Sequence, residues 1–176
     1  MSAVAKRYAK ALLALAAESG EGEAVGREVE RVAQAFAAGA LQAFASDTTL
    51  DRKTRRAVAA RVAETLGVSR LLRNFLGLLA ENNRLRDLPA IRSQYERLED
   101  HALGRVRARV LSAQPLSEES RARIREIFER QTGKRVIAEA GVAPELLGGA
   151  VVGLEGRVFD GSVRTRLERL RRALSG

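Results

Sequence analysis

Apolar residues recur every three or four positions along most of residues 1–103, which is the spacing that places them on one face of an α-helix. Residues 2–18 carry the first such run, with Ser2 in the position of a capping residue, and the segment Ser19-Gly20-Glu21-Gly22 ends it. The pattern predicts six helices and no strand in this part of the chain. The second helix contains Val25, Val29, Val32 and Phe36, the third is short and reaches Ala45, and the fourth covers about residues 50–66. The fifth helix begins at Ser69 and ends at Asn82-Asn83. The sixth is capped by Asp87 and carries Pro89 in its first turn.

The period of the apolar residues changes from 3.6 to two at Gly104. From there Arg105, Arg107 and Arg109 alternate with apolar residues, which predicts a strand with one buried face. Three more short strands are expected, and the last two are joined by a two-residue hairpin turn. They cover residues 135–140, 150–154 and, after the turn Glu155-Gly156, 157–159.

Two helices accompany these strands. The first follows Ser117, ends at Thr132-Gly133, and is expected to turn Ile124, Ile127 and Phe128 inward. We predict an α+β fold overall, with an all-α N-terminal six-helix bundle over residues 1–103 and a small α+β domain over residues 104–176. The second helix is capped by Asp160-Gly161-Ser162, with Val163, Leu167, Leu170 and Leu174 inside and Arg164, Arg166, Arg169, Arg171 and Arg172 outside.

Composition excludes several classes of protein. The 176 residues include no Cys and one His, so neither a disulfide framework nor an ordinary zinc or iron site can be built. No stretch approaches the roughly 20 apolar residues that span a bilayer, and no secretory signal pattern opens the chain. We therefore expect a soluble, intracellular protein without a metal or another cofactor.

The glycines at 148, 149, 153 and 156 do not form a nucleotide-binding motif. A phosphate-binding loop needs Lys and then Ser or Thr after its last glycine, whereas Leu154 follows Gly153. A dinucleotide-binding motif needs glycines that open a helix, and these open a strand and a hairpin. Tight turns and close backbone approach are the expected role of these glycines.

His101 and Asp100 do not predict a catalytic pair, because adjacent residues on a helix point about 100° apart. We expect a surface histidine near the end of its helix. The carboxylates of Glu96, Glu99 and Asp100 are expected to pair in solvent with arginines of the same helix, Arg92 and Arg97. No arrangement of residues supports an enzyme.

The formal charge of +9 is unevenly distributed, with a net +3 in residues 1–103 and a net +6 in residues 104–176. A basic surplus can serve nucleic acid, an anionic membrane or an acidic protein, or can be an ordinary solvated surface. One hypothesis is therefore a nucleic-acid-binding module that acts through Arg169, Arg171 and Arg172 of the last helix. The sequence lacks the exposed aromatic residues expected of a single-strand binder.

Two helices are apolar over a wider arc than a surface helix needs. In the first helix the apolar arc covers roughly 200°, and the fifth helix, which contains Leu71 to Leu79, shows the same excess. Half of each arc can face the core while the other half forms an apolar groove for an amphipathic partner helix. The alternative is that both helices are central and fully covered by their own domain. The groove edge is expected at Tyr8, Ala11 and Leu15 on the first helix and at Asn74 and Leu78 on the fifth.

Three stretches of the sequence resemble the delta subunit of the rotary ATP synthase, the bacterial relative of the mitochondrial oligomycin-sensitivity-conferring protein. RYAKALLALA from Arg7 to Ala16 resembles the family's opening helix, and FLGLLAENNRLRDLPAIRSQYERL from Phe75 to Leu98 resembles its fifth and sixth helices. LLGGAVVGLEGRVFDGSVRTRLERLRRAL from Leu146 to Leu174 resembles its closing signature. The last stretch is the most specific, because its glycines, strand, hairpin and basic helix occur in the family's order.

The resemblance implies a non-catalytic stator subunit. It implies that the N-terminal bundle, residues 1–103, holds an N-terminal helix of an alpha subunit between its first and fifth helices, where Tyr8, Ala11, Leu15, Asn74 and Leu78 lie. It also implies that residues 104–176 join the b subunits of the peripheral stalk, so that the catalytic head resists rotor torque. No nucleic acid and no cofactor is implied, and the isolated protein is expected to be a monomer.

The first 17 residues contain Lys and Arg and no acidic residue, as a mitochondrial presequence does. The resemblance begins at Arg7, which leaves no room for a removable segment. We therefore expect a bacterial protein at the cytoplasmic face of the cell membrane, associated with the membrane only through the ATP synthase complex.

Overall fold

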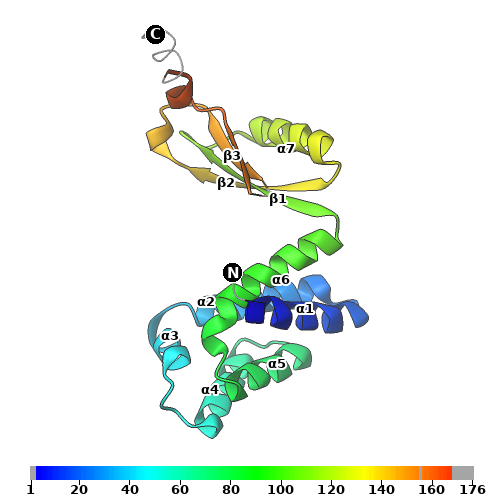
Figure 1. The fold of residues 1–176 in the computed structure, drawn as a ribbon, viewed down its shortest axis with the longest axis vertical. Coiled ribbons are helices and arrows are strands. Elements are labelled where there is room, and N and C mark those ends of the chain that lie inside the picture. Colours follow the sequence, from blue (N-terminus) through cyan, green and yellow to red (C-terminus); the bar gives the residue numbers. More distant parts are fainter. Residues whose placement is uncertain (1–2, 155, 168–176) are drawn as a thin grey trace. The chain divides into compact units, whose positions relative to one another are not determined.

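A computed structural model describes residues 3–154 and 156–167 of the chain (Figure 1). Contacts divide the chain into two compact units, Met1–Glu99 and Asp100–Gly176. The division falls before Gly104, and the side chain of Asp100, the first residue of the second unit, pairs with the strand that follows. Outside the described residues lie Ser2, Glu155, Leu170, Leu174, Arg169, Arg171 and Arg172.

The first unit contains the six predicted helices. Ser69, predicted to open the fifth helix, caps it, because Ser69 Oγ accepts a hydrogen bond from the backbone N–H of Leu72 at 3.3 Å. The fourth helix is capped by Asp51, whose carboxylate accepts a hydrogen bond from the backbone N–H of Thr54 at 2.6 Å. A short 3₁₀ turn, Leu85–Asp87, stands directly before the sixth helix. The helices are α1 (Ala3–Glu18), α2 (Gly22–Ala35), α3 (Gly39–Ser46), α4 (Arg52–Thr65), α5 (Arg70–Glu81) and α6 (Leu88–Ala102).

Small residues allow these helices to pack closely. The buried face of α1 consists of three alanines and one leucine, and all four are inaccessible to solvent. The buried face of α5 supplies larger side chains opposite them. The core residues are Ala5, Ala9, Leu12 and Ala16 from α1 and Leu72, Phe75, Leu76, Leu79 and Ala80 from α5, with Val25, Val29 and Val32 from α2 and Leu88, Ile91 and Tyr95 from α6.

Helix α6 packs against α2 at a glycine. A Cβ atom added at Gly26 would lie 3.2 Å from the ring of Tyr95 and 3.0 Å from the carboxylate of Glu99, so glycine is what allows this approach. The Tyr95 hydroxyl donates a hydrogen bond of 2.8 Å to the carbonyl oxygen of Gly22. Burial, together with the charge of Glu99, raises the pKa of Tyr95 well above its ordinary value.

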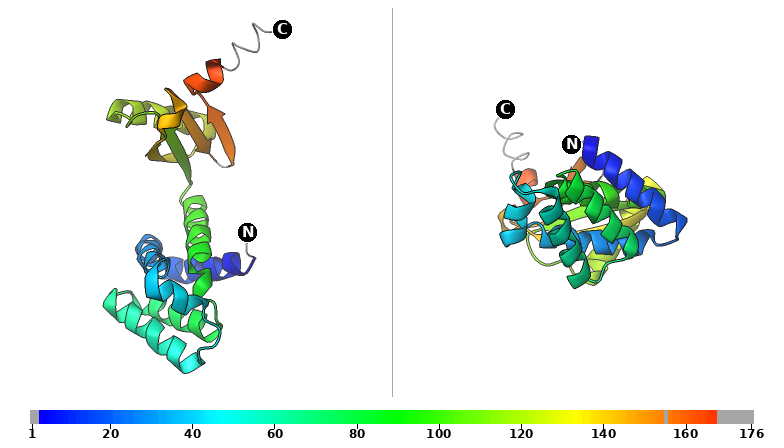
Figure 2. Two further views of the ribbon diagram at one scale, coloured as in Figure 1. Left: turned by 90° about the vertical axis from the view of Figure 1, so that its left-hand side faces the viewer. Right: turned by 90° about the horizontal axis from the view of Figure 1, so that it is seen from below.

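The second unit is a four-stranded sheet with the order β2-β1-β3-β4 and one long helix on one face (Figures 1 and 2). Strand β1 pairs in parallel with β2 and antiparallel with β3, and β3 forms the predicted hairpin with β4. Parallel pairing requires a crossover connection, which α7 supplies. The elements are β1 (Arg105–Ser112), α7 (Glu118–Thr132), β2 (Arg135–Val142), the 3₁₀ turn Pro144–Leu146, β3 (Ala150–Leu154) and β4 (Arg157–Asp160), and helical backbone resumes over residues 163–167.

The predicted inward position of Ile127 is wrong, because its side chain is 54% exposed. Helix α7 faces the sheet with Phe128, whose ring meets that of Phe159 edge-on at a centroid distance of 5.2 Å. Ile127 is rotated by about 100° from Phe128 around the helix axis, so it points to the side.

Val163 and Leu167 were also predicted to face inward, and both are exposed. The backbone N–H of Val163 donates to the carbonyl of Gly148 at 3.0 Å, which places the start of this helix beside the loop before β3. Neither Val163 nor Leu167 takes part in the core between α7 and the strands.

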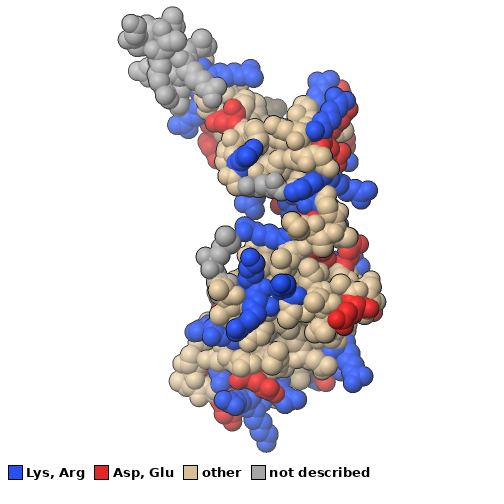
Figure 3. Space-filling view, turned by 45° about the vertical axis from the view of Figure 1, so that its right-hand side comes forward, with Lys and Arg blue, Asp and Glu red and all other residues tan. Residues whose placement is uncertain are grey.

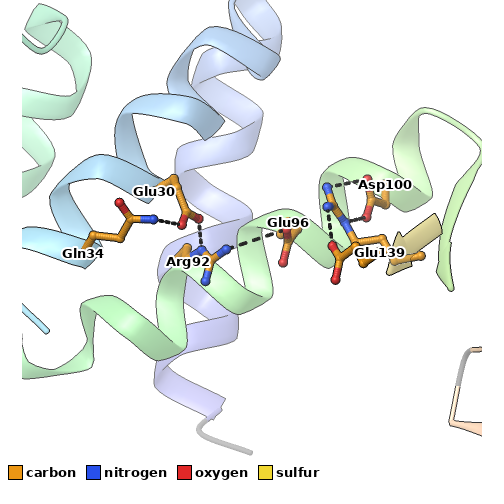
Figure 4. Close-up of polar contacts among 7 residues, drawn as sticks. Glu30, Gln34, Arg92, Glu96, Asp100 and Glu139 are labelled. Atoms are coloured by element: carbon orange, nitrogen blue, oxygen red, sulfur yellow. Dashed lines mark hydrogen bonds and ion pairs between the residues drawn. The ribbon is translucent and has the colours of Figure 1, made fainter. Parts of the chain in front are cut away.

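Asp100 does not pair in solvent with arginines of its own helix, as the sequence pattern suggested. It is only 6% exposed, and its carboxylate lies 2.6 Å from Nε of Arg107 and 3.3 Å from Nε of Arg105, both on β1. Arg107 also reaches Glu139 of β2 at 3.0 Å, so Asp100 and Glu139 converge in Figure 4. Strand β1 brings two guanidinium groups to this carboxylate. The periodicity of the helix that carries Asp100 could not predict this contact with a strand.

Arg92 forms the expected pair with Glu96 one turn along α6, at 4.0 Å. It forms a second ion pair with Glu30 of α2, whose carboxylate also accepts a hydrogen bond of 2.5 Å from Gln34 (Figure 4). The charged face of α6 therefore links two helices instead of only facing solvent.

The glycine-rich loop before β3 serves the close backbone approach expected of it. Gly149 has φ +75°, and a Cβ atom there would lie 2.4 Å from the carbonyl oxygen of Gly161. The N–H of Gly161 donates to the carbonyl of Ala150 at 3.0 Å, so the two segments are held backbone to backbone. Gly156, with φ +83°, has no atom within 4 Å of an added Cβ.

We expect Tyr95→Phe to change how stability depends on pH. The phenol titrates near pH 10 when unfolded and at higher pH when folded, so the unfolded state releases its proton first and stability falls as the pH rises above about 10. In Tyr95→Phe this fall should be smaller, while at neutral pH the lost hydrogen bond should cost about 1 kcal/mol. Urea unfolding between pH 8 and 11 measures both effects, and equal slopes for the two proteins would contradict the assignment.

We expect Gly149→Ala to destabilise the second unit far more than Gly156→Ala. Both substitutions place a side chain at positive φ, which costs about 1–2 kcal/mol. Only at position 149 does the new methyl group meet backbone atoms. The loss of stability in Gly149→Ala should therefore exceed the loss in Gly156→Ala by at least about 1 kcal/mol. Hydrogen exchange of the β1 and β3 amides measures the difference, and similar losses in both variants would disprove the backbone contact.

Candidate functional site

Helices α1 and α5 lie side by side in the first unit (Figures 1 and 2). Their contact includes two aromatic rings, because Tyr8 meets Phe75 edge-on with a centroid distance of 6.1 Å and an interplanar angle of 74°. Aromatic pairs of this geometry add about 0.5–1.5 kcal/mol beyond their buried area. The pair therefore fixes α1 against α5 at the place where the sequence predicts a binding site.

Exposed apolar side chains continue from this ring pair along both helices. Ala11 and Leu15 follow Tyr8 by three and seven residues and so share its face of α1, and Leu78 follows Phe75 by three on α5. Leu15 is 51% exposed and Leu78 is 47% exposed, although both lie on helices whose other side is fully buried. We name Tyr8, Ala11, Leu15, Asn74, Phe75 and Leu78 the α1–α5 surface.

Asn74 adds a polar group to this surface. It is exposed, and its side-chain amide forms no hydrogen bond with another described residue. The amide can both donate and accept, so it can bind a backbone or side-chain group of a partner. Of the predicted residues, the contacts bring Tyr8 onto α5, while Ala11, Leu15, Asn74 and Leu78 stay accessible.

Phe75 was not among the predicted site residues, although it makes the ring contact. It is 8% exposed and counts as a core residue. The available signal was its position at the edge of the apolar arc of α5, immediately after Asn74. Sequence reasoning placed Phe75 on the apolar arc of α5 but not at the groove edge, because periodicity does not distinguish a residue that contacts both the core and an exposed surface.

Two side chains of α2 hold the start of α5. The carboxylate of Glu28 accepts hydrogen bonds from the backbone N–H and the hydroxyl of Ser69, at 3.0 and 2.7 Å, and Ser69 caps α5. Arg31 donates to the carbonyl of Leu66 at 3.1 Å, in the turn before Ser69. An acidic group at a helix N-terminus is favourable, so Glu28 both caps and positions α5.

The described residues offer no arrangement for catalysis or metal binding. Among them, no three His, Asp or Glu side chains gather in a way that could hold a metal ion. His101 is exposed in the last turn of α6, as expected, and the neighbouring Asp100 is engaged with Arg105 and Arg107. Within the same residues, no helix has the length and apolar character needed to cross a membrane.

The basic side chains are not confined to the second unit. On the face drawn in Figure 3, Lys and Arg lie over both units, with Asp and Glu and uncharged surface between them. A basic surface of this kind does not by itself indicate nucleic acid. Arg169, Arg171 and Arg172, on which that hypothesis rests, lie outside the described residues.

Comparison with known proteins gives one consistent family. The model of the family described as "ATP synthase delta (OSCP) subunit" matches residues 4–174. ATP synthase subunit delta 2 of Syntrophotalea carbinolica is 38% identical over 170 residues, which are 96% of this chain and 95% of that protein. ATP synthase subunit delta of Anaeromyxobacter dehalogenans is 37% identical over 175 residues, which are 99% of this chain and 98% of that protein.

A solved structure shares the fold. A chain of the Toxoplasma gondii mitochondrial ATP synthase hexamer matches with a TM-score of 0.71 and 22% identity, and the match covers 99% of both chains. Fold and sequence together thus define a non-catalytic subunit of an ATP synthase. The chain belongs to the ATP synthase delta (OSCP) family and is a stator subunit of that complex, which carries out ATP synthesis and proton transport.

We expect Glu28→Ala to lower the free energy of unfolding of the first unit by about 1–2 kcal/mol, because it removes the acceptor of two hydrogen bonds at the start of α5. Glu28→Gln keeps an acceptor oxygen and should lose about half as much. Urea unfolding followed by circular dichroism measures both. A Gln variant as unstable as the Ala variant would show that charge, and not the hydrogen bonds, is what matters.

Proposed function

We propose that the α1–α5 surface binds the N-terminal amphipathic helix of an ATP synthase alpha subunit. The observation that carries the proposal is the exposure of Leu15 and Leu78 beside the Tyr8–Phe75 contact. An amphipathic helix can cover such side chains with its own apolar face, and Asn74 can bind a polar group at the edge. The wide apolar arcs of α1 and α5 then have a cause outside their own unit.

We further propose that the second unit joins the b subunits of the peripheral stalk. A subunit that binds the catalytic head through one unit and the stalk through the other transmits the torque on the head to the stator. The two units have separate hydrophobic cores, which supports two separate binding roles. Family membership supports the same assignment of the binding roles to residues 1–103 and residues 104–176.

In this proposal the protein acts at the cytoplasmic face of a bacterial cell membrane and reaches the membrane only through the ATP synthase complex. The relatives compared above from Syntrophotalea carbinolica and Anaeromyxobacter dehalogenans are bacterial proteins, which supports the assignment to a bacterium. Isolated, the protein is expected to be a monomer, since its exposed apolar residues are matched by helices of other chains.

We expect Leu78→Asp to weaken binding of a synthetic peptide of the alpha subunit's N-terminal helix by about 100-fold. The substitution removes apolar contact and places an unpaired carboxylate in the interface, which together cost about 3 kcal/mol or more. Tyr8→Asp should have a similar effect. Titration calorimetry at low and high salt measures the affinity, and binding of the unaltered protein should survive high salt and show a negative heat-capacity change.

Ile127→Asp is the matched control, because Ile127 is about as exposed as Leu78 but lies on α7 in the second unit. It should bind the peptide like the unaltered protein. Circular dichroism must show that each variant keeps its helices. Full binding by both Leu78→Asp and Tyr8→Asp would refute the placement of the site.

A further inference from the structure

The edge of the α1–α5 surface carries the same order of residues on both helices. Arg7 on α1 is followed at intervals of four, four and three residues by an alanine, a leucine and a glutamate, and Arg70 on α5 is followed at the same intervals by an asparagine, a leucine and a glutamate. Residues three or four apart are neighbours on one side of a helix, so each set forms one continuous row. The α1 row is Arg7, Ala11, Leu15 and Glu18, and the α5 row is Arg70, Asn74, Leu78 and Glu81.

Each row begins with an arginine that has no charge partner among the described residues. Arg7 and Arg70 are exposed, and the side chain of neither forms a hydrogen bond or an ion pair with another residue that the structure describes. A second cation follows each arginine by three residues, Lys10 on α1 and Arg73 on α5, and in the described part of the chain both are likewise exposed and unpaired. The two rows therefore place unpaired cations beside the exposed leucines.

The carboxylates of the rows do not neutralise these cations. Glu81 pairs with Arg56 of α4 at 2.7 Å, and Glu18 forms no ion pair with any described residue. Within its row, each glutamate comes eleven residues after the arginine, which is about 16 Å along the helix axis and about twice the Debye length at physiological salt. The positive end of each row is therefore left without compensation from its own row.

These charges are not placed to stabilise their own helices. Arg70 is the first residue of α5 and Glu81 is the last, whereas the helix dipole favours an acidic residue at the first position and a basic residue at the last. Glu18 likewise ends α1. A charge that opposes the dipole of its helix and has no partner in its own unit, as at Arg70, points to a role outside that unit.

Unpaired cations beside exposed leucines favour an acidic amphipathic helix as the partner. A nucleic acid would satisfy the cations but would leave Leu15 and Leu78, which are about half exposed, without apolar contact. A helix covers the leucines with its apolar stripe and can carry carboxylates on the two sides of that stripe. A guanidinium group can bind a carboxylate with two parallel hydrogen bonds.

We propose that Arg7 and Arg70 are the specificity-determining residues of the α1–α5 surface, and that each binds a carboxylate beside the apolar stripe of the bound helix. The inference rests on the helix-binding role proposed above and adds the charge of the helix to it. The leucines hold the helix, while the arginines speed its association and select it over amphipathic helices whose stripe has basic residues beside it, because charges at the rim of an interface act mainly on association rate and specificity.

The test uses the full chain and two synthetic peptides. The first is the alpha subunit's N-terminal helix, and in the second the acidic residues beside its apolar stripe are replaced by lysine. At low salt Arg7→Glu and Arg70→Glu should each weaken binding of the first peptide about 5-fold, and the double variant about 25-fold, because independent sites contribute additively. The second peptide should bind the double variant more tightly than it binds the unaltered protein.

Arg123→Glu is the matched control, because it makes the same change of net charge at an exposed residue of α7 in the second unit. It should bind both peptides as the unaltered protein does. Both arginines are exposed and unpaired among the described residues, so the free energy of unfolding of the Arg7→Glu and Arg70→Glu variants should be nearly unchanged, which urea unfolding checks.

Salt and kinetics separate the arginines from the leucines. At 1 M salt, where the Debye length is about 3 Å, the Arg7→Glu and Arg70→Glu variants should come within about 2-fold of the unaltered protein, while Leu78→Asp should still bind weakly. Stopped-flow mixing should show a slower association for the arginine variants and a faster dissociation for Leu78→Asp.

The outcomes distinguish this proposal from the one on which it rests. If Leu78→Asp loses the first peptide and both arginine variants bind it as Arg123→Glu does, the arginines do not select the helix, and the helix-binding role stands. Equal affinity of the unaltered protein for the two peptides would also overturn the selection by charge. If the unaltered protein binds neither peptide, the helix-binding role and this proposal both fail. Binding of duplex DNA that the double variant loses, with peptide binding intact, would assign the arginines to nucleic acid and overturn the proposal.

Discussion

Close packing around the alanines of α1 is the constraint on which the rest of the first unit depends. Ala5, Ala9 and Ala16 are fully buried, so their backbone lies near the neighbouring helices and leaves little room for larger side chains between them. Leu15 and Leu78 consequently remain outside the core. A bundle that is filled by small residues can therefore hold a complete interior and still present large apolar side chains to another chain.

In this stator subunit, ion pairs and exposed apolar residues have different roles. Buried or half-buried ion pairs, such as those of Asp100 with Arg105 and Arg107, hold elements of the same unit together, and breaking one partner of a buried pair is costly. The exposed apolar residues contribute little to the fold of the isolated chain. A stator subunit needs this division, since it has to keep its shape under load while its binding surfaces exchange water for a partner.

The six helices, the four strands and the hairpin could be predicted from the sequence, because periodicity and turn residues are local signals. The predicted inward positions of Ile127 and Val163 were wrong. Both residues follow an apolar pattern, but their burial depends on which side of each helix meets the sheet, and the pattern does not give that side. The pairing of Asp100 with β1 was not predicted, because it joins residues that only the tertiary fold brings together. The role of Phe75 beside Tyr8 was missed for the same reason.

The parallel pairing of β1 with β2 has a consequence for how the chain emerges during synthesis. Each pair of facing residues in that pairing is 30 positions apart in the sequence, as Arg105 and Arg135 are, so β1 has no parallel neighbour until α7 and β2 have been synthesised. An unpaired strand can associate with other incompletely folded chains. Alternate arginines along β1 keep it charged during this interval, as gatekeeper residues do in aggregation-resistant sequences.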